Sequence, residues 1–549
     1  MNKCPKCASK LRFDIKAQMF ACERCGTLIG PGRMEQDAEP EMEEYFEAAI
    51  YSCEQCGGEM VCDNTMTVPF CSYCGSSTVT GGRMGKCMRP KHIIPFQKTR
   101  EDCQKAYKEM VKGAFFAPDA YRDEDQLERF RAVYVSYWVY DMSANQKIEF
   151  EGIKNTQRGE YRVTHHVGFE TRLRTRFQGL TIEASLAFPD RLNTLIEPFR
   201  LSEKKTFLPE YLRGFYTDTN DVEIRDYETI AQNVAVGECY KEFGELYPRY
   251  EFNDDVATTS LKEALSVHDV NGELAMFPVW LWSYRKKDKV AYALMNGQTG
   301  KMAVELPIDL KKFLGVASLV SLPFILLFNF FFVIESRTLL SMLGFLALFL
   351  GILISEKIVQ ALEHSFHEDF LTLVPKKESE RRKKYRGANR ILRIAGIVTF
   401  IAMFLYCFLN ALVRSEMLLT RFDEIVENVL LLSKIGLFLM PLLGTAGIFI
   451  WTWKRLKKSY RIDEVSIFHE EAYQKEWNRK LLYLIKPVLT VLMVMIVLFF
   501  NPLSNIAYHA ALIGEMGMLL WSILDLVKLR NETQLHPLPE FENTGGEER

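Results

Sequence analysis

The feature that most constrains this chain is a repeated pattern of cysteine pairs near its N-terminus. Four Cys-x-x-Cys pairs stand in the first 74 residues and hold eight of the 13 cysteines. The first set is Cys4, Cys7, Cys22 and Cys25, and the second, 49 positions later, is Cys53, Cys56, Cys71 and Cys74. Two such turns facing each other across a hairpin bring four thiolates onto one ion. The spacing therefore predicts two tandem zinc ribbons with two structural Zn²⁺, iron in the same four-sulfur geometry being the alternative.

Both predicted sites are closed, because four thiolates leave no position for water or substrate, and closed sites are structural. A module this small cannot fold on its apolar residues alone, so metal binding supplies folding energy. Cys62 and Cys87 are interpreted as small buried hydrophobes, with a role as competing ligands as the alternative. The N-terminal segment MNKCPKCASK has no apolar stretch, so we expect no secretory signal and reduced thiols in the cytosol.

Changes of composition divide the chain into a multidomain protein. The predicted units are zinc ribbon 1 at 1–30, an acidic linker at 31–50, zinc ribbon 2 at 51–90, a cytosolic α+β domain at 91–310, a membrane domain at 311–530 and a disordered tail at 531–549. The linker carries seven acids and one Arg, so it is interpreted as solvated chain or a short acidic helix. We refer to the part before the membrane domain as the head.

The α+β domain shows strand and helix patterns with an internal similarity. Tyr137-Trp138-Val139-Tyr140 is similar to Val279-Trp280-Leu281-Trp282, which predicts duplicated β-units. Residues 291–306 are typical of a hairpin, in which Asn296-Gly297 and Gly300 would supply positive φ. Residues 100–116 and 227–243 have helical patterns.

Long apolar runs begin after Lys312, although the mean hydropathy of the whole chain is only −0.06. Each run is close to the ~20 residues needed to cross a bilayer. They predict an all-α polytopic domain of six helices, at about 313–334, 338–355, 391–413, 429–452, 481–500 and 506–527.

The loops between these runs predict an orientation. Residues 376–390 hold eight basic and two acidic residues, and the loop at 454–480 begins KRLKK. Basic loops stay in the cytoplasm. With six crossings both termini then lie in the cytoplasm, and we expect a multi-pass protein of the cytoplasmic (inner) membrane. The loop at 376–390 is also a candidate contact with anionic lipid.

The charge of the ribbon region bears on its partners. Residues 1–90 contain ten Lys+Arg and twelve Asp+Glu, a balance of −2. Eight thiolates with two Zn²⁺ contribute a further −4, which gives about −6, whereas phosphate binding needs positive charge. Nucleic acid is therefore disfavoured, and protein binding is the preferred interpretation. The aromatic residues of the β-units offer a binding face or, as the alternative, core packing: Tyr137, Trp138, Tyr140, Trp280 and Trp282.

A few ionisable residues fall within or beside the apolar runs. Glu515 is near the middle of the sixth, and Lys486 is near the cytoplasmic end of the fifth. An intramembrane acid suggests a functional site, and hydrogen bonding between helices or pairing with His509 or Lys486 is the structural alternative. His364 and His367, at i and i+3, would form an incomplete metal site or part of an interfacial helix face.

Several segments together resemble a known family. They are CEQCGGEMVCDNTMTVPFCSYCG, then Lys91-His-Ile-Ile-Pro-Phe96, Tyr134-Val-Ser-Tyr-Trp138, LAMFPVWLWSY and LMNGQTGKMAVELP. Over about residues 50–310 the chain resembles bacterial TFIIB-type zinc-ribbon-containing membrane proteins, which are functionally uncharacterised. The resemblance implies metal ligation by Cys53, Cys56, Cys71 and Cys74. Some relatives look like companions of phage-shock (PspA-type) envelope-stress proteins, which implies an adaptor at the membrane.

These observations favour one function and leave two others open. No nucleophile elbow, P-loop, dinucleotide fingerprint or zincin motif is present in the sequence, so we expect no enzyme and no catalytic residue. The preferred interpretation is a non-catalytic adaptor or scaffold whose cytosolic head recruits protein partners to the membrane. A transporter or membrane enzyme regulated by the head is the alternative, with Glu515 as the residue to test, and a membrane tether for DNA is the third.

Overall fold

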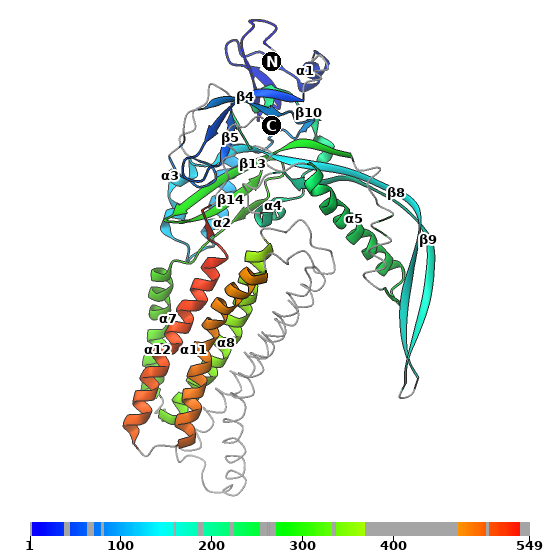
Figure 1. Cartoon of the computed structure of the whole chain (residues 1–549). Helices are drawn as coiled ribbons and strands as arrows, with labels where there is room; N and C mark the ends of the chain where they lie inside the picture. Colours follow the sequence, from blue (N-terminus) through cyan, green and yellow to red (C-terminus); the bar gives the residue numbers. More distant parts are fainter. Residues whose placement is uncertain are drawn as a thin grey trace.

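A computed structural model of the chain shows a β-rich head above a bundle of long helices (Figure 1). The structure describes residues 3–37, 44–62, 71–77, 79, 82–158, 161–184, 190–218, 224–252, 261, 263, 271–331, 336–367, 470–500 and 504–538.

The first cysteine module, residues 3–37, is a three-stranded antiparallel sheet followed by a short helix. Its elements are β1 (Leu11–Asp14), β2 (Met19–Cys22), β3 (Leu28–Ile29) and α1 (Pro31–Asp37). The alternation in β1 buries Leu11 and Phe13. Phe13 and Phe20 contact Tyr211 of the η3 turn (Pro209–Leu212), with ring centroids 5.0 and 4.7 Å away. The module is therefore docked on the head through shared apolar packing.

The second cysteine module, residues 44–88, is part of the main sheet. It contains β4 (Tyr45–Ser52), β5 (Glu59–Cys62) and β6 (Arg83–Met88). β5 pairs with β11 (Tyr216–Asp218), so the module adds strands to one side of the sheet. α1 lies in the segment predicted as an acidic linker at 31–50, for which a short helix is one interpretation, and residues 45–50 of that segment belong to β4. The predicted division into domains stays a prediction.

The main sheet has thirteen strands, and its path runs β10-β7-β13-β8-β11-β5-β4-β6. Strands not yet given are β7 (His92–Ile93), β8 (Arg131–Arg158), β9 (Tyr161–Glu183), β10 (Lys205–Thr206), β12 (Glu251–Phe252), β13 (Asn271–Lys286), β14 (Lys289–Asn296), β15 (Met302–Val304) and β16 (His536–Pro537). The shorter helical elements are η1 (Asp119–Arg122), α3 (Glu124–Leu127), α4 (Asp190–Ile196) and η2 (Leu201–Glu203).

The two similar sequence motifs lie on adjacent central strands. β13 pairs antiparallel with β8, and each continues into a hairpin, with β14 and β9 respectively. Gly300 has the expected positive φ of 82°. Gly297 does not, and a Cβ there would lie 2.6 Å from the Phe96 ring, so close packing explains this glycine.

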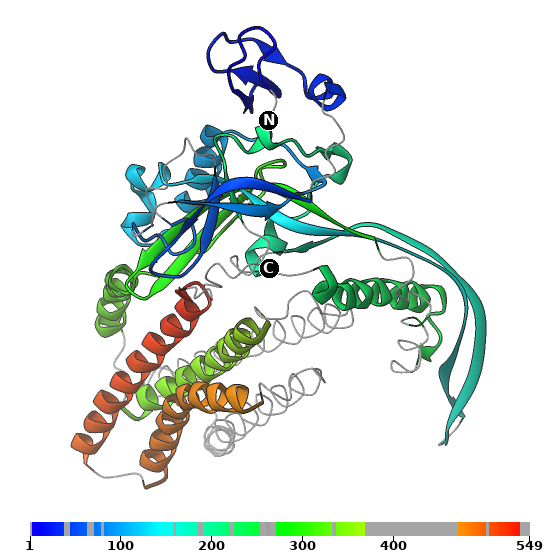
Figure 2. The same cartoon turned by 45° about the horizontal axis from the view of Figure 1, so that its top comes forward.

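Both expected helices of the head are present. α2 (Arg100–Lys112) starts at a capping box, in which the Thr99 hydroxyl accepts from the Asp102 backbone N–H and the Asp102 carboxylate accepts from the Thr99 backbone N–H. α5 (Ile224–Leu246) lies along the hairpin formed by β8 and β9 (Figures 1 and 2).

The outer part of this hairpin, from Met142 to Phe177, extends away from the head, and we call it the arm (Figure 2). Met142, Ile148, Phe150 and Leu173 are buried in one cluster with residues of α5. Phe150 stacks on Phe169 at 5.4 Å and meets Phe243 of α5 at 4.9 Å. The helix therefore supplies the core that a two-stranded ribbon lacks.

Four long helices are described below the head. They are α7 (Leu310–Phe331), α8 (Ser336–His367), α11 (Glu470–Phe500) and α12 (Asn505–Glu532). Three stretches in the described chain are long and apolar enough to cross a membrane, namely Leu339–Ile358, Asn478–Phe500 and Asn505–Glu532.

The expected count of six helices is not supported by these three. The predicted spans 338–355, 481–500 and 506–527 lie within α8, α11 and α12, and 313–334 overlaps α7. The predicted spans 391–413 and 429–452 lie outside the described residues, as does the basic loop 376–390.

The chain after the last helix returns to the head, so the expectation of a disordered tail at 531–549 is wrong over 531–538. Asn531 brackets the backbone of Ile308, accepting its N–H at 2.7 Å and donating to its carbonyl at 2.9 Å. β16 pairs with β14, and the buried His536 ring contacts the Glu305 carboxyl. The rest of the expected tail lies outside the described residues.

Candidate metal centres

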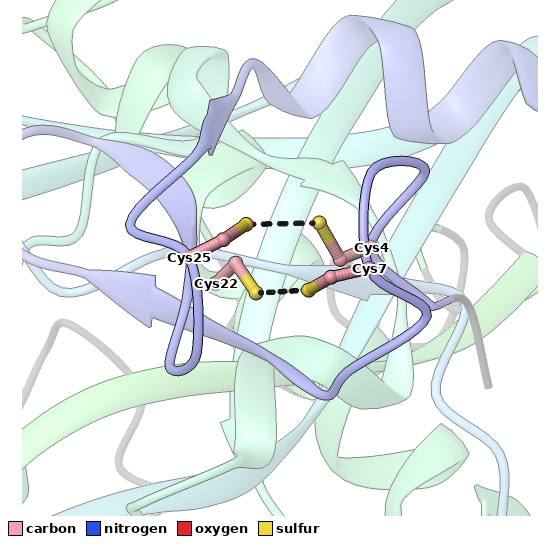
Figure 3. A group of neighbouring side chains, drawn as sticks. All are labelled: Cys4, Cys7, Cys22 and Cys25. Atoms are coloured by element: carbon pink, nitrogen blue, oxygen red, sulfur yellow. Dashed lines mark hydrogen bonds between the residues drawn. The ribbon is translucent and has the colours of Figure 1, made fainter.

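The first four cysteines converge from two turns of the N-terminal module (Figure 3). The Sγ atoms of Cys4 and Cys25 are 3.6 Å apart, and those of Cys7 and Cys22 are 3.4 Å apart. All four sulfurs lie within 4.8 Å of one another. Cys4 and Cys22 are buried, whereas Cys25 is exposed.

The second four cysteines form the same arrangement inside the head. The Sγ atoms of Cys53 and Cys74 are 3.6 Å apart, and those of Cys56 and Cys71 are 3.7 Å apart. All four residues are buried. Cys53 and Cys71 pack in one core cluster with strands β8, β13 and β14. This tetrad is therefore part of the core of the main sheet, in contrast to the peripheral first tetrad.

Each Cys-x-x-Cys pair closes a turn of one kind. The N–H four positions after the first cysteine donates to that cysteine's carbonyl, at 2.8 to 3.0 Å. The N–H of the first cysteine donates to the carbonyl five positions later, at 2.6 to 3.0 Å. The residue directly after the second cysteine has positive φ in all four turns: Ala8 (54°), Gly26 (67°), Gly57 (76°) and Gly75 (70°). This conformation turns backbone N–H groups toward the sulfurs, and it explains the three glycines in the sequence.

The sulfur spacing fits a tetrahedral ion. Metal–sulfur bonds of ~2.3 Å place the sulfurs of a tetrahedral site about 3.8 Å apart. The separations of 3.4 to 3.7 Å are close to this value. The structure therefore brings together both sets of predicted ligands, and each set could hold a metal ion. Cys62 and Cys87 belong to neither set, and Cys62 is a buried residue of β5.

The surroundings favour thiolates at particular sulfurs. The Thr27 hydroxyl lies 3.1 Å from Cys25 Sγ, and hydrogen bonds from the Thr27 side chain and backbone lower the pKa of Cys25 to about 6. In the second tetrad, hydrogen bonds among the cysteines lower the pKa of Cys53 and raise the pKa values of Cys56 and Cys71. Metal binding requires thiolates, so the lowered pKa of Cys25 favours ligation at that sulfur.

The aromatic residues considered for a binding face are buried. Tyr137, Tyr140 and Trp282 belong to the core, as do Trp138 and Trp280. The core interpretation of these five residues is therefore the correct one.

Glu515 is a buried polar residue of α12. Its side chain is fully buried, and neither carboxylate oxygen has a hydrogen-bond partner in the described part of the chain. The pairing considered with Lys486 is wrong, because Lys486 forms an ion pair with Asp525 and lies 4.0 Å from the centre of the Trp521 ring. His364 and His367 lie in the last turns of α8, where the side chains are outside the described part.

Sequence reasoning missed two features of the metal centres and one ion pair between the long helices. Ala8 occupies a position that glycine fills in the other three turns, and alignment of the four turns would have identified it. Thr27 follows Cys25 by two positions, where a hydroxyl can reach the sulfur. Asp525 lies ten residues after Glu515 in the same apolar run, and only the packing of α11 against α12 pairs it with Lys486.

Comparison with known proteins gives one informative similarity. The chain is 23% identical over 323 residues to the uncharacterised protein YdjG of Bacillus subtilis (strain 168). The similar region covers 57% of this chain and 93% of YdjG. No protein-family model matches the chain, and no solved structure matches it. Because YdjG is itself uncharacterised, the similarity carries no activity to this chain.

Proposed function

We propose that this protein is a non-catalytic adaptor of the bacterial cytoplasmic membrane, whose cytosolic head recruits a partner protein. Two structural Zn²⁺ hold the head together, and the helices anchor it. The link to envelope stress rests on the family resemblance alone. The single observation that carries the adaptor proposal is an exposed apolar surface at the edge of the main sheet.

This surface lies on β4 and β6, and β6 ends the path of the sheet. Tyr45 pairs with Met88, and the buried Ala49 pairs with Met84, so these side chains share one face. The exposed pair Glu47 and Lys86 lies between them on that face, so the exposed apolar side chains flank one pair of opposite charges. Tyr45 is 45% exposed and Met84 is 58% exposed. An edge strand can accept an extended segment of a partner, with apolar side chains as anchors. We call Tyr45, Met84 and Met88 the edge surface.

Zinc is the proposed ion because four thiolates in tetrahedral geometry are typical of structural zinc. Metal analysis of the purified protein should find about two zinc per chain. Cys53→Ser should remove one equivalent and destabilise the head, since that tetrad is part of its core. One zinc or none in the unaltered protein would contradict this part of the proposal, and iron would correct the ion.

The proposed topology has six crossings with both termini in the cytoplasm. Ile308 precedes α7, Asn531 lies in the last turn of α12, and these two residues are hydrogen-bonded to each other at the head. A chain that leaves and returns to one side crosses an even number of times, which disfavours three crossings. The number six rests on the apolar runs of the sequence, which include 391–413 and 429–452. Reporters fused after Ala388 and after Tyr460 should report cytoplasm, and one near Glu424 the exterior.

The adaptor proposal is tested by crosslinking in native membranes followed by identification of captured proteins. Met84→Asp should remove a specific partner, because a charge in the edge surface opposes an apolar contact. Met110→Asp is the matched control: Met110 is a similarly exposed methionine on α2, outside the edge surface. If both variants capture the same proteins as the unaltered chain, the edge surface does not recruit.

The alternative is a transporter or membrane enzyme regulated by the head. The observation that favours it is Glu515, a carboxyl fully buried in a candidate membrane helix without a hydrogen-bond partner in the described residues. Glu515→Gln should abolish an ion-coupled activity and leave recruitment intact. If Glu515→Gln removes the cellular phenotype while Met84→Asp and Cys71→Ser leave the captured proteins unchanged, the transporter replaces the adaptor.

A further inference from the structure

The two candidate metal centres differ in how far their sulfurs are covered. All four cysteines of the second tetrad are buried, with exposed fractions of 4% or less. In the first tetrad Cys4 and Cys22 are buried, Cys7 is half-buried and Cys25 is exposed. Of the two centres, the first therefore presents a ligand sulfur to solvent and the second does not.

The last turn of each tetrad shows the cause of this difference. Gly26 and Gly75 occupy the same position, directly after the fourth cysteine, and both have positive φ. A Cβ on Gly75 would lie 3.5 to 3.6 Å from Ser283 and Arg285 of β13, so the main sheet covers that turn. A Cβ on Gly26 would have no heavy atom within 4 Å in the described part of the chain, apart from its chain neighbours. The turn that carries Cys25 is therefore open.

The position of the first module adds to this exposure. The module lies at the end of the head opposite the long helices (Figures 1 and 2). Exposed cysteine thiolates are the ones that oxidants modify. A small oxidant reaches Cys25 from solvent without passing the main sheet or the helices.

The spacing of the sulfurs allows a second cysteine to react with an oxidised Cys25. Cys4 Sγ lies 3.6 Å from Cys25 Sγ (Figure 3). The Cys25 thiolate attacks one oxygen of hydrogen peroxide, the O–O bond breaks, and a sulfenic acid and one hydroxide form. The Cys4 thiolate then attacks the Cys25 sulfur, the S–O bond breaks and a second hydroxide leaves. Two thiolates are oxidised to one disulfide, one peroxide is reduced to two hydroxides, and the ion loses two of its four ligands.

Loss of the ion has a consequence outside the first module. A module of this size needs the ion to fold. When folded, it covers Tyr211 of η3 through Phe13 and Phe20, and the Arg213 guanidinium donates to the Leu11 carbonyl at 2.9 Å. Tyr211 is fully buried in this arrangement. Unfolding of the first module therefore uncovers an apolar part of the head at η3.

We propose that the first metal centre is an oxidation-sensitive switch. Peroxide joins Cys4 to Cys25, the ion leaves, and the first module detaches from η3 while the second centre stays intact. This inference rests on the two-metal part of the proposed function and adds a regulation to it.

The test is treatment of the purified full-length protein with hydrogen peroxide. A colorimetric chelator measures released zinc, and mass spectrometry maps the disulfides. We expect release of one of the two zinc equivalents, a disulfide between Cys4 and Cys25, and a second tetrad that stays reduced at least tenfold longer. Hydrogen exchange should increase over η3 and remain unchanged over β14. Reductant together with Zn²⁺ should reverse these changes.

Two variants test the role of the exposed thiol. Cys25→His retains a ligand, because Cys₃His sites also bind structural zinc, and it removes the sulfur that peroxide attacks. Peroxide should release zinc from this variant at least tenfold more slowly than from the unaltered protein. Cys87→Ser is the control, since Cys87 is a half-buried cysteine of β6 outside both tetrads, and it should leave the rate unchanged.

The disulfide map separates this inference from the metal proposal. Fewer than two zinc before oxidation contradicts the metal proposal, whereas the map reports on the switch whichever ion is bound. The switch is overturned if peroxide oxidises both tetrads at equal rates or leaves Cys4 and Cys25 reduced. It is also overturned if Cys25→His releases zinc as fast as the unaltered protein, or if exchange over η3 does not change.

Discussion

At the scale of single residues, the metal centres depend on one backbone conformation repeated four times. Glycine reaches positive φ without strain, whereas a residue with a Cβ pays a steric penalty of about 1 kcal/mol there. Ala8 therefore carries a strain that the corresponding glycines avoid. The first turn of the first module has Ala8 where the first turn of the second module has Gly57. A substitution in each module therefore tests the same backbone position in opposite directions.

Ala8→Gly should stabilise the first module by about 0.5–1 kcal/mol, because it removes the strain at φ 54°. Gly57→Ala should destabilise the second module by about 1 kcal/mol, because it introduces that strain at φ 76°. For each variant, the rate at which the protein releases its metal to a chelator is compared with the rate for the unaltered protein. Equal rates for Ala8→Gly and the unaltered protein would show that the first turn is not strained.

A second prediction concerns the pH dependence of stability. Burial raises the pKa of Glu197 from 4.5 to about 7, and the charge of Lys301 opposes this only in part. The folded state favours the protonated carboxyl, so Glu197 costs nothing below pH 4.5 and destabilises the head as pH rises through about 7. At higher pH the cost approaches about 3 kcal/mol.

Glu197→Gln should therefore raise the free energy of unfolding by about 2–3 kcal/mol at pH 8.5 and leave it unchanged at pH 4. Denaturant unfolding of the head, followed by tryptophan fluorescence, measures the difference. Glu109→Gln, at an exposed carboxyl of α2, is the control and should have no effect at either pH. A Glu197→Gln effect of the same size at both pH values would indicate packing instead.

At the scale of elements, the arm depends on α5 for its core. A two-stranded ribbon alone is marginal in water, and one face of the arm is buried only because the helix lies on it. Phe150 is the central contact, since it touches both the opposite strand and the helix.

Phe150→Ala should release the arm and α5 from each other, at a cost of about 3–5 kcal/mol to that local unit. Hydrogen exchange should increase over β9 and α5 and remain unchanged over β14, whose buried residues pack in other clusters. Exchange that increases equally in all three elements would mean that the arm and the main sheet unfold together.

At this scale, the sequence predicts those features that depend on neighbouring residues alone. The spacing of Cys53, Cys56, Cys71 and Cys74 is required by the ion, and the Thr99 capping box marks the start of α2. Tyr45 to Ile50 follow an acidic run in the sequence, and pairing with β6 and, at Ala49 and Ile50, also with β5 makes them part of a strand. β16 could not be predicted, since two residues have no strand pattern of their own and α12 alone carries them to β14.

At the scale of the whole molecule, the head and the helices are joined by segments far apart in the sequence. The first long helix is held by Lys312, whose ammonium donates to the Ala117 carbonyl at 2.9 Å, and by contact of Phe313 with Phe116. The last helix is held by Asn531 and by β16. A movement of α12 is therefore transmitted to the sheet through β16, whereas a movement of α7 is transmitted to the segment that follows α2.

His536→Ala should destabilise the head by about 3 kcal/mol, because it leaves the buried Glu305 carboxyl without its ring partner. His536→Gln retains a donor and should recover most of the loss. Thermal unfolding of the purified protein measures both. If His536→Ala and His536→Gln melt together at the unaltered temperature, β16 contributes nothing to the head.

The pairing of β14 with β16 also sets an order of assembly during translation. β14 leaves the ribosome before the long helices, and β16 leaves it after them, so the head sheet stays incomplete until the intervening helices have been synthesised. During that interval β14 lacks the partner at Lys289 and Val290, and Glu305 lacks His536. If the long helices cross a membrane as proposed, a chain that stalls or inserts wrongly presents an unfinished strand to proteases and chaperones, and a completed head marks a chain whose helices have been inserted.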